Sequence, residues 1–283
     1  MNNFERPTVD EHFTYKLRRH LINLMCFDSG DEARKANNGK PLIYNFSAFV
    51  VELGGDWLAV TAGHIFDDLK KAISKGGRIS NWQIDDSSVT DKPATPYPFH
   101  LDIDSVLYLH DDVPGMDYAT FPLDALTVMA LKNEGIVPVT HDLWDGDDFR
   151  QYPHWILIGT PYMPELLHGK SVYEKYIMAI QLVQRDTAPD GIEQKEYRCL
   201  FADLDWDSVD GDNKPATVDG MSGGPIFALN VVNTSDYSYK LIGVQSARND
   251  SGSVAFCAMP PFLRALQSAA LKLQTRSAGE ESQ

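Results

Sequence analysis

The spacing of hydrophobic residues along this chain changes near residue 42. Before that point, the pattern predicts an amphipathic helix over residues 8–25, followed by a polar loop. After it, short runs are rich in β-branched and aromatic residues. The runs 42–53 and 57–63 flank a Gly-Gly-Asp break and predict a β-hairpin. The helix is predicted from apolar residues at helical spacing: Phe13, Leu17, Leu21 and Leu24.

Further short apolar runs continue to the C-terminal part of the chain. They predict strands at 105–110, 117–123, 155–161, 176–185, 196–204, 224–232, 239–247 and 253–259. Helical patterns are few, at 65–77, 126–135 and 260–274. Many short strands with frequent turns predict an all-β, mainly antiparallel fold built as barrels or a sandwich.

Composition narrows the classes of partner. The chain has 283 residues and a formal net charge of -15, which argues against a nucleic-acid partner because phosphate binding needs a basic surface. No apolar run reaches the roughly 18 residues that span a bilayer, so no membrane partner is expected. The first residues lack the basic and then apolar segments of a secretory signal.

The cysteines are few and widely separated: Cys26, Cys199 and Cys257. They form no CxxC pair, and their number is odd, so we expect neither a disulfide framework nor a zinc site. No His, Cys and carboxylate group has metal-ligand spacing, so we expect no metal and no cofactor. Together with the missing secretory signal, these features predict a reducing, cytoplasmic compartment.

One glycine-rich segment carries candidate chemistry. The sequence VDGMSGGPIF (218–227) places Ser222 among three glycines, ahead of an apolar run. It fits both the G-x-S-x-G elbow of α/β-hydrolases and the G-x-S-G-G-P loop of chymotrypsin-type peptidases. An α/β-hydrolase has its histidine after the serine, and all eight histidines of this chain precede Ser222. A turn serine without catalytic function is the remaining alternative.

The chymotrypsin order of histidine, aspartate and serine has candidates at suitable positions. His64 follows the apolar run and small-residue turn of WLAVTAGH, and Asp117 opens the apolar strand of DYATFPL. Asp111, Asp112 and Asp124 are nearby competitors. We prefer Asp117 because an apolar strand follows it directly, as burial of a catalytic carboxylate requires.

Three boxes in this order resemble those of trypsin-like serine peptidases. TAGH is similar to their T-A-x-H box, DYA to their D-[IL]-A box and GMSGGP to their nucleophile loop. The resemblance covers roughly residues 42–274, and the lack of disulfides resembles intracellular bacterial members. It implies two six-stranded antiparallel β-barrels with an N-terminal and a C-terminal helix. The implied divisions are a helical extension (1–40), a first barrel (41–125), a connection (126–149), a second barrel (150–260) and a helix with polar tail (261–283).

The resemblance also implies a role for each residue. His64 is the expected general base and acid, Asp117 orients its imidazole, and Ser222 is the nucleophile that forms an acyl-enzyme. The backbone N–H groups of Gly220 and Ser222 are expected to form the oxyanion hole, which glycine geometry permits.

Activation and specificity follow from departures from the family pattern. Met221 stands where zymogen-activated relatives have an aspartate, so we expect no trypsinogen-type activation and a loop ordered by packing, by a partner or by substrate. Ala216, with Thr217 next to it, takes the place of the pocket floor, which predicts a small or medium apolar side chain before the scissile bond. The substrate main chain is expected to pair with the segment Val244, Gln245, Ser246 and Ala247.

The sequence therefore predicts a serine endopeptidase acting on polypeptides. A second hypothesis is a catalytically latent trypsin-like scaffold that binds peptides or proteins as a regulatory module. It would keep the lobes with the oxyanion loop collapsed, and a protein activator or effector would then be a partner. A serine esterase on another fold is disfavoured by the histidine order.

Overall fold

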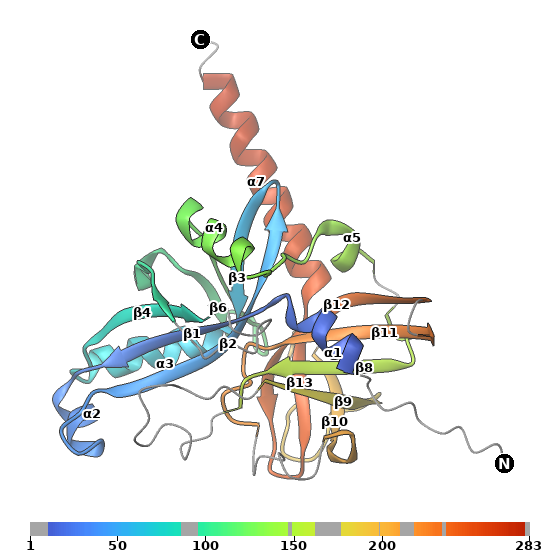
Figure 1. Ribbon diagram of the computed structural model, residues 1–283, viewed down its shortest axis with the longest axis horizontal. Coiled ribbons are helices and arrows are strands. Elements are labelled where there is room, and N and C mark those ends of the chain that lie inside the picture. The colour runs from blue at the N-terminus through green and yellow to red at the C-terminus, as the bar shows by residue number, and fades with distance from the viewer. Residues whose placement is uncertain are drawn as a thin grey trace.

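The computed structural model describes residues 11–85, 96–146, 149–161, 177–197, 199–209, 218–233 and 236–280. Its strands form two antiparallel sheets that lie side by side, each made from one half of the chain (Figure 1). The mainly antiparallel β fold expected from the sequence is confirmed.

The first sheet comes from the N-terminal half and has seven strands in the order β5-β4-β1-β2-β3-β7-β6. Every pairing in it is antiparallel. Many of its buried side chains pack with those of helix α3 (Gly63–Ser74) in one apolar cluster. The strands are β1 (Leu21–Asp28), β2 (Leu42–Leu53), β3 (Asp56–Thr61), β4 (Ile79–Asp85), β5 (Tyr97–Pro98), β6 (Leu107–His110) and β7 (Asp117–Pro122).

The second sheet comes from the C-terminal half and closes into a six-stranded barrel in the order β10-β13-β12-β11-β8-β9. A separate apolar cluster fills the barrel. Its strands are β8 (His154–Gly159), β9 (Met178–Arg185), β10 (Leu200–Asp205), β11 (Pro225–Asn233), β12 (Asp236–Arg248) and β13 (Ser253–Ala258).

Helices lie at the margins of the two sheets. In the described ranges, none of them is long and apolar enough to cross a membrane. Helix α7 leaves the body of the molecule and ends far from it (Figure 1). The helices are α1 (Glu11–Arg18), α2 (Asp31–Ala36), α3 (Gly63–Ser74), α4 (Ala125–Asn133), α5 (His141–Trp144) and α7 (Met259–Glu280), with 3-10 turns η2 (Ile103–Ser105) and η3 (Trp206–Ser208).

The N-terminal helix is shorter than the sequence pattern predicts. The prediction of a helix over residues 8–25 is wrong beyond Arg18, because residues 21–28 form strand β1. Almost every side chain of β1 is buried, so its apolar run is continuous and has no strand period to distinguish it from a buried helix. The first sheet thus begins at Leu21, and β1 makes it larger than the six strands expected.

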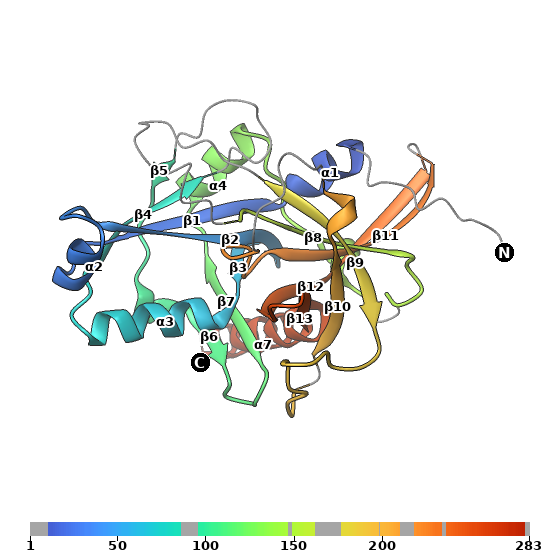
Figure 2. The ribbon, with the colours of Figure 1, turned by 90° about the horizontal axis from the view of Figure 1, so that it is seen from below.

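A shared apolar core joins the two sheets. It combines side chains of the first sheet, such as Phe49 and Tyr118, with side chains of the barrel, such as Phe227 and Val244. Helix α7 closes this core from one side, where Phe262 stacks on Tyr118 with ring centroids 4.3 Å apart. Figure 2 shows α3 beside the first sheet and α7 beneath the barrel strands. We call the first sheet with its helices the first lobe and the barrel the barrel lobe. The loops that meet between the two lobes are therefore held by a common core.

Candidate active site

His64 lies at the junction of a strand and a helix. Strand β3 ends at Thr61, and α3 begins at Gly63, so His64 occupies the first turn of the helix. Gly63 packs against backbone oxygens of Leu109 and Tyr118 so closely that a Cβ atom would overlap with them. The small residues before His64 therefore permit the close approach of β6 and β7 that brings Asp117 to the histidine.

Asp117 binds His64 through both carboxylate oxygens. Its Oδ1 accepts a hydrogen bond from the backbone N–H of His64 at 2.7 Å, and its Oδ2 lies 2.8 Å from His64 Nδ1. Asp117 is the first residue of β7 and is only 4% exposed. An ionised carboxylate accepts only, so this geometry assigns the proton to Nδ1 and leaves Nε2 free to accept a proton.

A third group binds the same carboxylate. The hydroxyl of Ser246, on β12, donates a 2.5 Å hydrogen bond to Oδ2 of Asp117. The sequence predicted substrate binding for Ser246 and missed this contact. The signal for it was weak, because 129 residues separate the two partners. The contact fixes Asp117 against the barrel as well as against α3.

Burial and charge act in opposite directions on these two groups. Burial lowers the pKa of His64, but the hydrogen bond and charge of Asp117, together with the charges of Asp68 and Asp67, outweigh it, so the pKa of His64 is raised above its ordinary value. Burial raises the pKa of Asp117, but the hydrogen bond and charge of His64, with the Ser246 hydroxyl, leave it lowered. The pair therefore favours an ionised Asp117 and a His64 that accepts protons readily.

The competing aspartates have other partners. Asp111 forms an ion pair with Lys195 at 2.8 Å, and the side chain of Asp112 accepts a hydrogen bond from the backbone N–H of His110. Asp124 caps the N-terminus of α4 by accepting from the N–H groups of its first turn. Asp117 is thus the candidate that the structure brings to His64.

Ser222 follows a tight turn in the barrel lobe. The N–H of Met221 donates to the carbonyl oxygen of Val218 at 3.0 Å, and Gly220 has φ +86 at the third position of this turn. A positive φ at that position is the mark of a type II turn, which requires glycine. Across the described residues, neither the N–H of Gly220 nor that of Ser222 has a hydrogen-bond acceptor. Two adjacent donors are thus available to a ligand.

Ser47, on β2, holds this turn from the opposite lobe. Its hydroxyl donates to the carbonyl oxygen of Gly220 at 2.9 Å and accepts from the N–H of Thr160 at 2.9 Å. Its backbone N–H also donates to Gly220 O, at 3.3 Å, and its own carbonyl accepts from the Thr61 hydroxyl at 2.8 Å. No sequence pattern pointed to this residue, which is fully buried.

Met221 anchors the same turn by packing. It is fully buried in the apolar cluster inside the barrel, and its carbonyl oxygen accepts from the N–H of Gly224 at 2.8 Å. Packing therefore holds the turn at this position without a charged group, which is one of the possibilities that the sequence left open.

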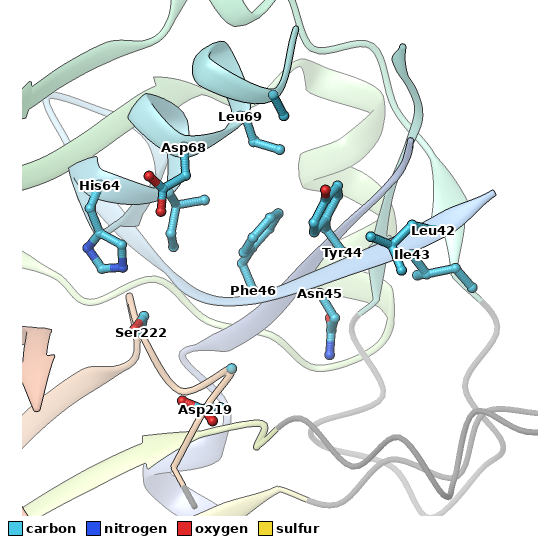
Figure 3. A pocket seen from close by; sticks show the side chains of 13 residues that line it. Leu42, Ile43, Tyr44, Asn45, Phe46, His64, Asp68, Leu69, Asp219 and Ser222 are labelled. Atoms are coloured by element: carbon cyan, nitrogen blue, oxygen red, sulfur yellow. The ribbon is translucent and has the colours of Figure 1, made fainter. Parts of the chain in front are cut away.

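His64 and Ser222 line one cleft between the lobes, at the end away from Leu42 and Ile43 (Figure 3). Within the described part of the chain, no hydrogen bond joins the two side chains. Such a bond is often long in an unliganded hydrolase and shortens when substrate binds. The arrangement brings together a histidine base with its orienting carboxylate, a serine hydroxyl and two free N–H donors.

Only some of the residues predicted to bind substrate line a cleft in the described structure. Ala216 and Thr217 lie outside the described residues. Val244 and Gln245 are buried in the barrel, and they line neither this cleft nor the second one beside His64. Ser246 and Ala247 line the second cleft.

Arg248, to which no sequence motif pointed, follows them at the end of β12. Its side chain pairs with Asp219, with Nε 3.0 Å from Oδ1. Asp219 directly precedes Gly220, so this ion pair links the end of β12 to the turn that carries the free N–H groups.

No group of three or more His, Cys, Asp or Glu side chains with metal-site geometry occurs in the described residues. The three cysteines are free thiols, two of them buried.

Comparison with known proteins gives similarity in structure alone. No protein-family model matches the chain, and no curated protein matches it in sequence. Solved structures do match. They include trypsin-like serine proteases.

They include a thermostable serine protease, AL20, from an extremophilic microorganism (12% identity, 85% of this chain and 91% of that chain, TM-score 0.46). The inactive form of the Rv3671c protease matches at 13% identity over 94% of this chain and 95% of that chain, with TM-score 0.47. Deg5 matches at 14% identity over 92% and 94%, with TM-score 0.47.

Proposed function

We propose that this protein is a serine endopeptidase in which Ser222 is the nucleophile, His64 the general base and Asp117 the orienting group. The observation that carries the proposal is the double hydrogen bond between Asp117 and His64 at the end of the cleft that Ser222 also lines. This arrangement holds one imidazole tautomer, stabilises the imidazolium and leaves Nε2 facing the cleft.

The reaction proceeds through an acyl-enzyme. His64 takes the proton of the Ser222 hydroxyl as its oxygen attacks the scissile carbonyl carbon, and the N–H groups of Gly220 and Ser222 stabilise the oxyanion. His64 then gives the proton to the leaving amine, and a water molecule hydrolyses the ester by the same path. Loss of one such oxyanion donor costs about 10²–10³ in rate in a well-studied hydrolase.

An open strand edge supports a polypeptide as substrate. Strand β13 pairs with β12 as far as Arg248, but the pairing of β11 with β12 ends at Val244. Among the described strands, residues 246–248 therefore have one unpaired edge, beside Ser222, where an extended peptide can add as a strand. The free thiols fit a reducing compartment, and we place the protein in the cytoplasm.

The second candidate is a latent scaffold that binds peptides without cleaving them, and one observation fits it as well as the first. In the described structure, His64 and Ser222 do not share a hydrogen bond. A protein activator or a bound substrate would then be required to complete the site.

Labelling with a fluorophosphonate probe separates the two candidates. We expect the protein to be labelled, and we expect Ser222→Ala and His64→Ala to abolish labelling. His100→Ala, at an exposed histidine outside the site, serves as the matched control and should label like the native protein. A native protein that resists the probe, yet binds peptides, would favour the latent scaffold.

A further inference from the structure

Two clefts of different chemistry meet at His64. The first, of about 400 Å³, extends from Ser222 along β2 and α3. The second, of about 350 Å³, extends along the end of β12 and includes Ser246, Ala247 and Arg248. No β12 residue lines the first cleft, and His64 alone is common to both.

The chemistry of acyl transfer assigns a substrate half to each cleft. The acyl half pairs with the open edge of β12, so it lies along the second cleft. The leaving amine takes its proton from His64, on the side of the histidine away from β12. The residue that follows the scissile bond therefore enters the first cleft.

Most walls of the first cleft are apolar, although the carboxylate of Asp68 lies beside His64 and that of Asp219 also lines the cleft. On β2, Tyr44 and Phe46 point to the same side, and their rings stack with centroids 6.2 Å apart. On α3, Ile65, Leu69 and Ala72 recur at spacings of four and three, which places them on one face of the helix. Figure 3 shows the Phe46 and Tyr44 rings and Leu69 facing the same space.

The second cleft differs in its walls. Charged side chains are more numerous there than in the first cleft, and they include the ion pair of Asp111 with Lys195 and the guanidinium of Arg248. The first cleft therefore favours a large apolar side chain on the amine side of the scissile bond. The described part of the second cleft, on the acyl side, has no apolar wall of this kind.

We propose that this site selects its substrates by a large apolar residue, such as leucine or phenylalanine, directly after the scissile bond. The proposal rests on the proposed endopeptidase function and adds the substrate class. Phe46, Ile65 and Leu69 form the recognising wall. Selection of this kind acts through the leaving group, so it also governs the reverse step, in which an amine attacks the acyl-enzyme.

The reverse step provides the test, because it needs no knowledge of the acyl-side preference. p-Nitrophenyl acetate acetylates the serine and releases p-nitrophenolate. An amino-acid amide then attacks the acetyl carbon, the bond to Ser222 Oγ breaks, the amine proton passes to His64, and the serine oxygen regains it. The ratio of N-acetyl amide to acetate measures how well each amine occupies the first cleft.

We expect leucinamide and phenylalaninamide to capture the acetyl group about tenfold or more better than glycinamide, the discrimination typical of an apolar pocket. Phe46→Ala should reduce this ratio severalfold. Ala72→Glu, which places a carboxylate in the cleft at a half-buried helix position, should reduce it without opening a cavity. Ile73→Ala, on the exposed face of the same helix, is the matched control and should keep the native ratio.

The outcomes distinguish this proposal from the function on which it rests. Acetylation at Ser222 with equal capture of all three amides would overturn the selection and leave the endopeptidase standing. Another outcome is that the native protein, Phe46→Ala and Ala72→Glu all favour leucinamide to the same degree. That result would place the selecting wall elsewhere and would also overturn the proposed selection. Absence of both acetylation and fluorophosphonate labelling would overturn both proposals.

Discussion

The hydroxyl of Ser47 in one lobe donates a hydrogen bond to the carbonyl oxygen of Gly220 in the other. The same peptide unit carries the Met221 N–H, which is bonded to Val218, so the peptide is held at both ends. The Gly220 N–H belongs to the preceding peptide unit. Because the following peptide unit is held and Gly220 has the positive φ of a type II turn, the direction of this N–H is determined. The first lobe thereby sets the geometry of the donors beside Ser222.

Ser47→Ala should therefore slow the reaction with a fluorophosphonate. The substitution leaves the buried Thr160 N–H without its acceptor and Gly220 O with one donor fewer, which costs about 1–3 kcal/mol. We expect labelling to slow by about ten- to hundredfold, measured as a second-order rate constant. Ser74→Ala, which removes an exposed hydroxyl bonded to a carbonyl on α3, is the control. Native labelling combined with a lowered melting temperature in Ser47→Ala would mean that Ser47 serves stability alone.

The pH dependence of labelling should report the His64 pKa. The base must be neutral, so the rate rises with pH as His64 loses its proton. Since Asp117 raises that pKa, we expect the half-maximal rate above pH 6.5. A half-maximal rate below pH 6.5 would mean that burial outweighs Asp117 and the neighbouring carboxylates.

Asp117→Asn should change both the midpoint and the plateau of that profile. Without the carboxylate, burial is opposed only by the smaller effects of Asp68 and Asp67 on the His64 pKa, so the midpoint moves to lower pH. The amide can also hold the wrong imidazole tautomer, and we expect the plateau to fall by up to about 10⁴. Asp124→Asn, at the cap of α4, controls for general loss of stability. Labelling of Asp117→Asn at the native rate would exclude an orienting role for Asp117.

Sequence reasoning locates some parts of the site and misses others for a physical reason. His64 and Ser222 stand out because each lies in a run of small residues that local backbone geometry requires. Ser47 does not, because its partner Gly220 is 173 residues away and serine is ordinary in a strand. Ser246 was noticed for another role, since its bond to Asp117 depends on how the two lobes dock.

The fold shows the same division between local and long-range information. Hairpin β2–β3 and most later strands follow from period and turn residues. Strand β1 does not, because it is covered on both faces and its apolar run fits a helix equally well. Its identity is decided by pairing with β2 and β4, which the local pattern does not contain.

The ion pair between Arg248 and Asp219 should hinder the acyl half of a peptide. It connects the open edge of β12 to the turn before Ser222. A bound peptide must lie between this edge and this turn, so the ion pair crosses its path. The pair is partly exposed, so it is worth about 0.2–1 kcal/mol. We expect Arg248→Ala to speed peptide cleavage by up to about fivefold. Salt should speed the native enzyme and leave the variant unchanged, and slower cleavage by Arg248→Ala would show that the guanidinium binds substrate.

Gly223 should be the least replaceable glycine of the nucleophile segment. It has φ +83, and a Cβ atom there would overlap with the Thr61 hydroxyl and the Ser47 carbonyl oxygen, both in the first lobe. Gly39 has the same φ of +83 with no atom near its Cβ position, so Gly39→Ala isolates the backbone cost of about 1–2 kcal/mol. Thermal unfolding of the two variants should show at least twice the loss for Gly223→Ala, together with loss of labelling. Equal losses would mean that the lobes separate easily at this point, and Ser47 would then be too loosely placed to orient the Gly220 peptide.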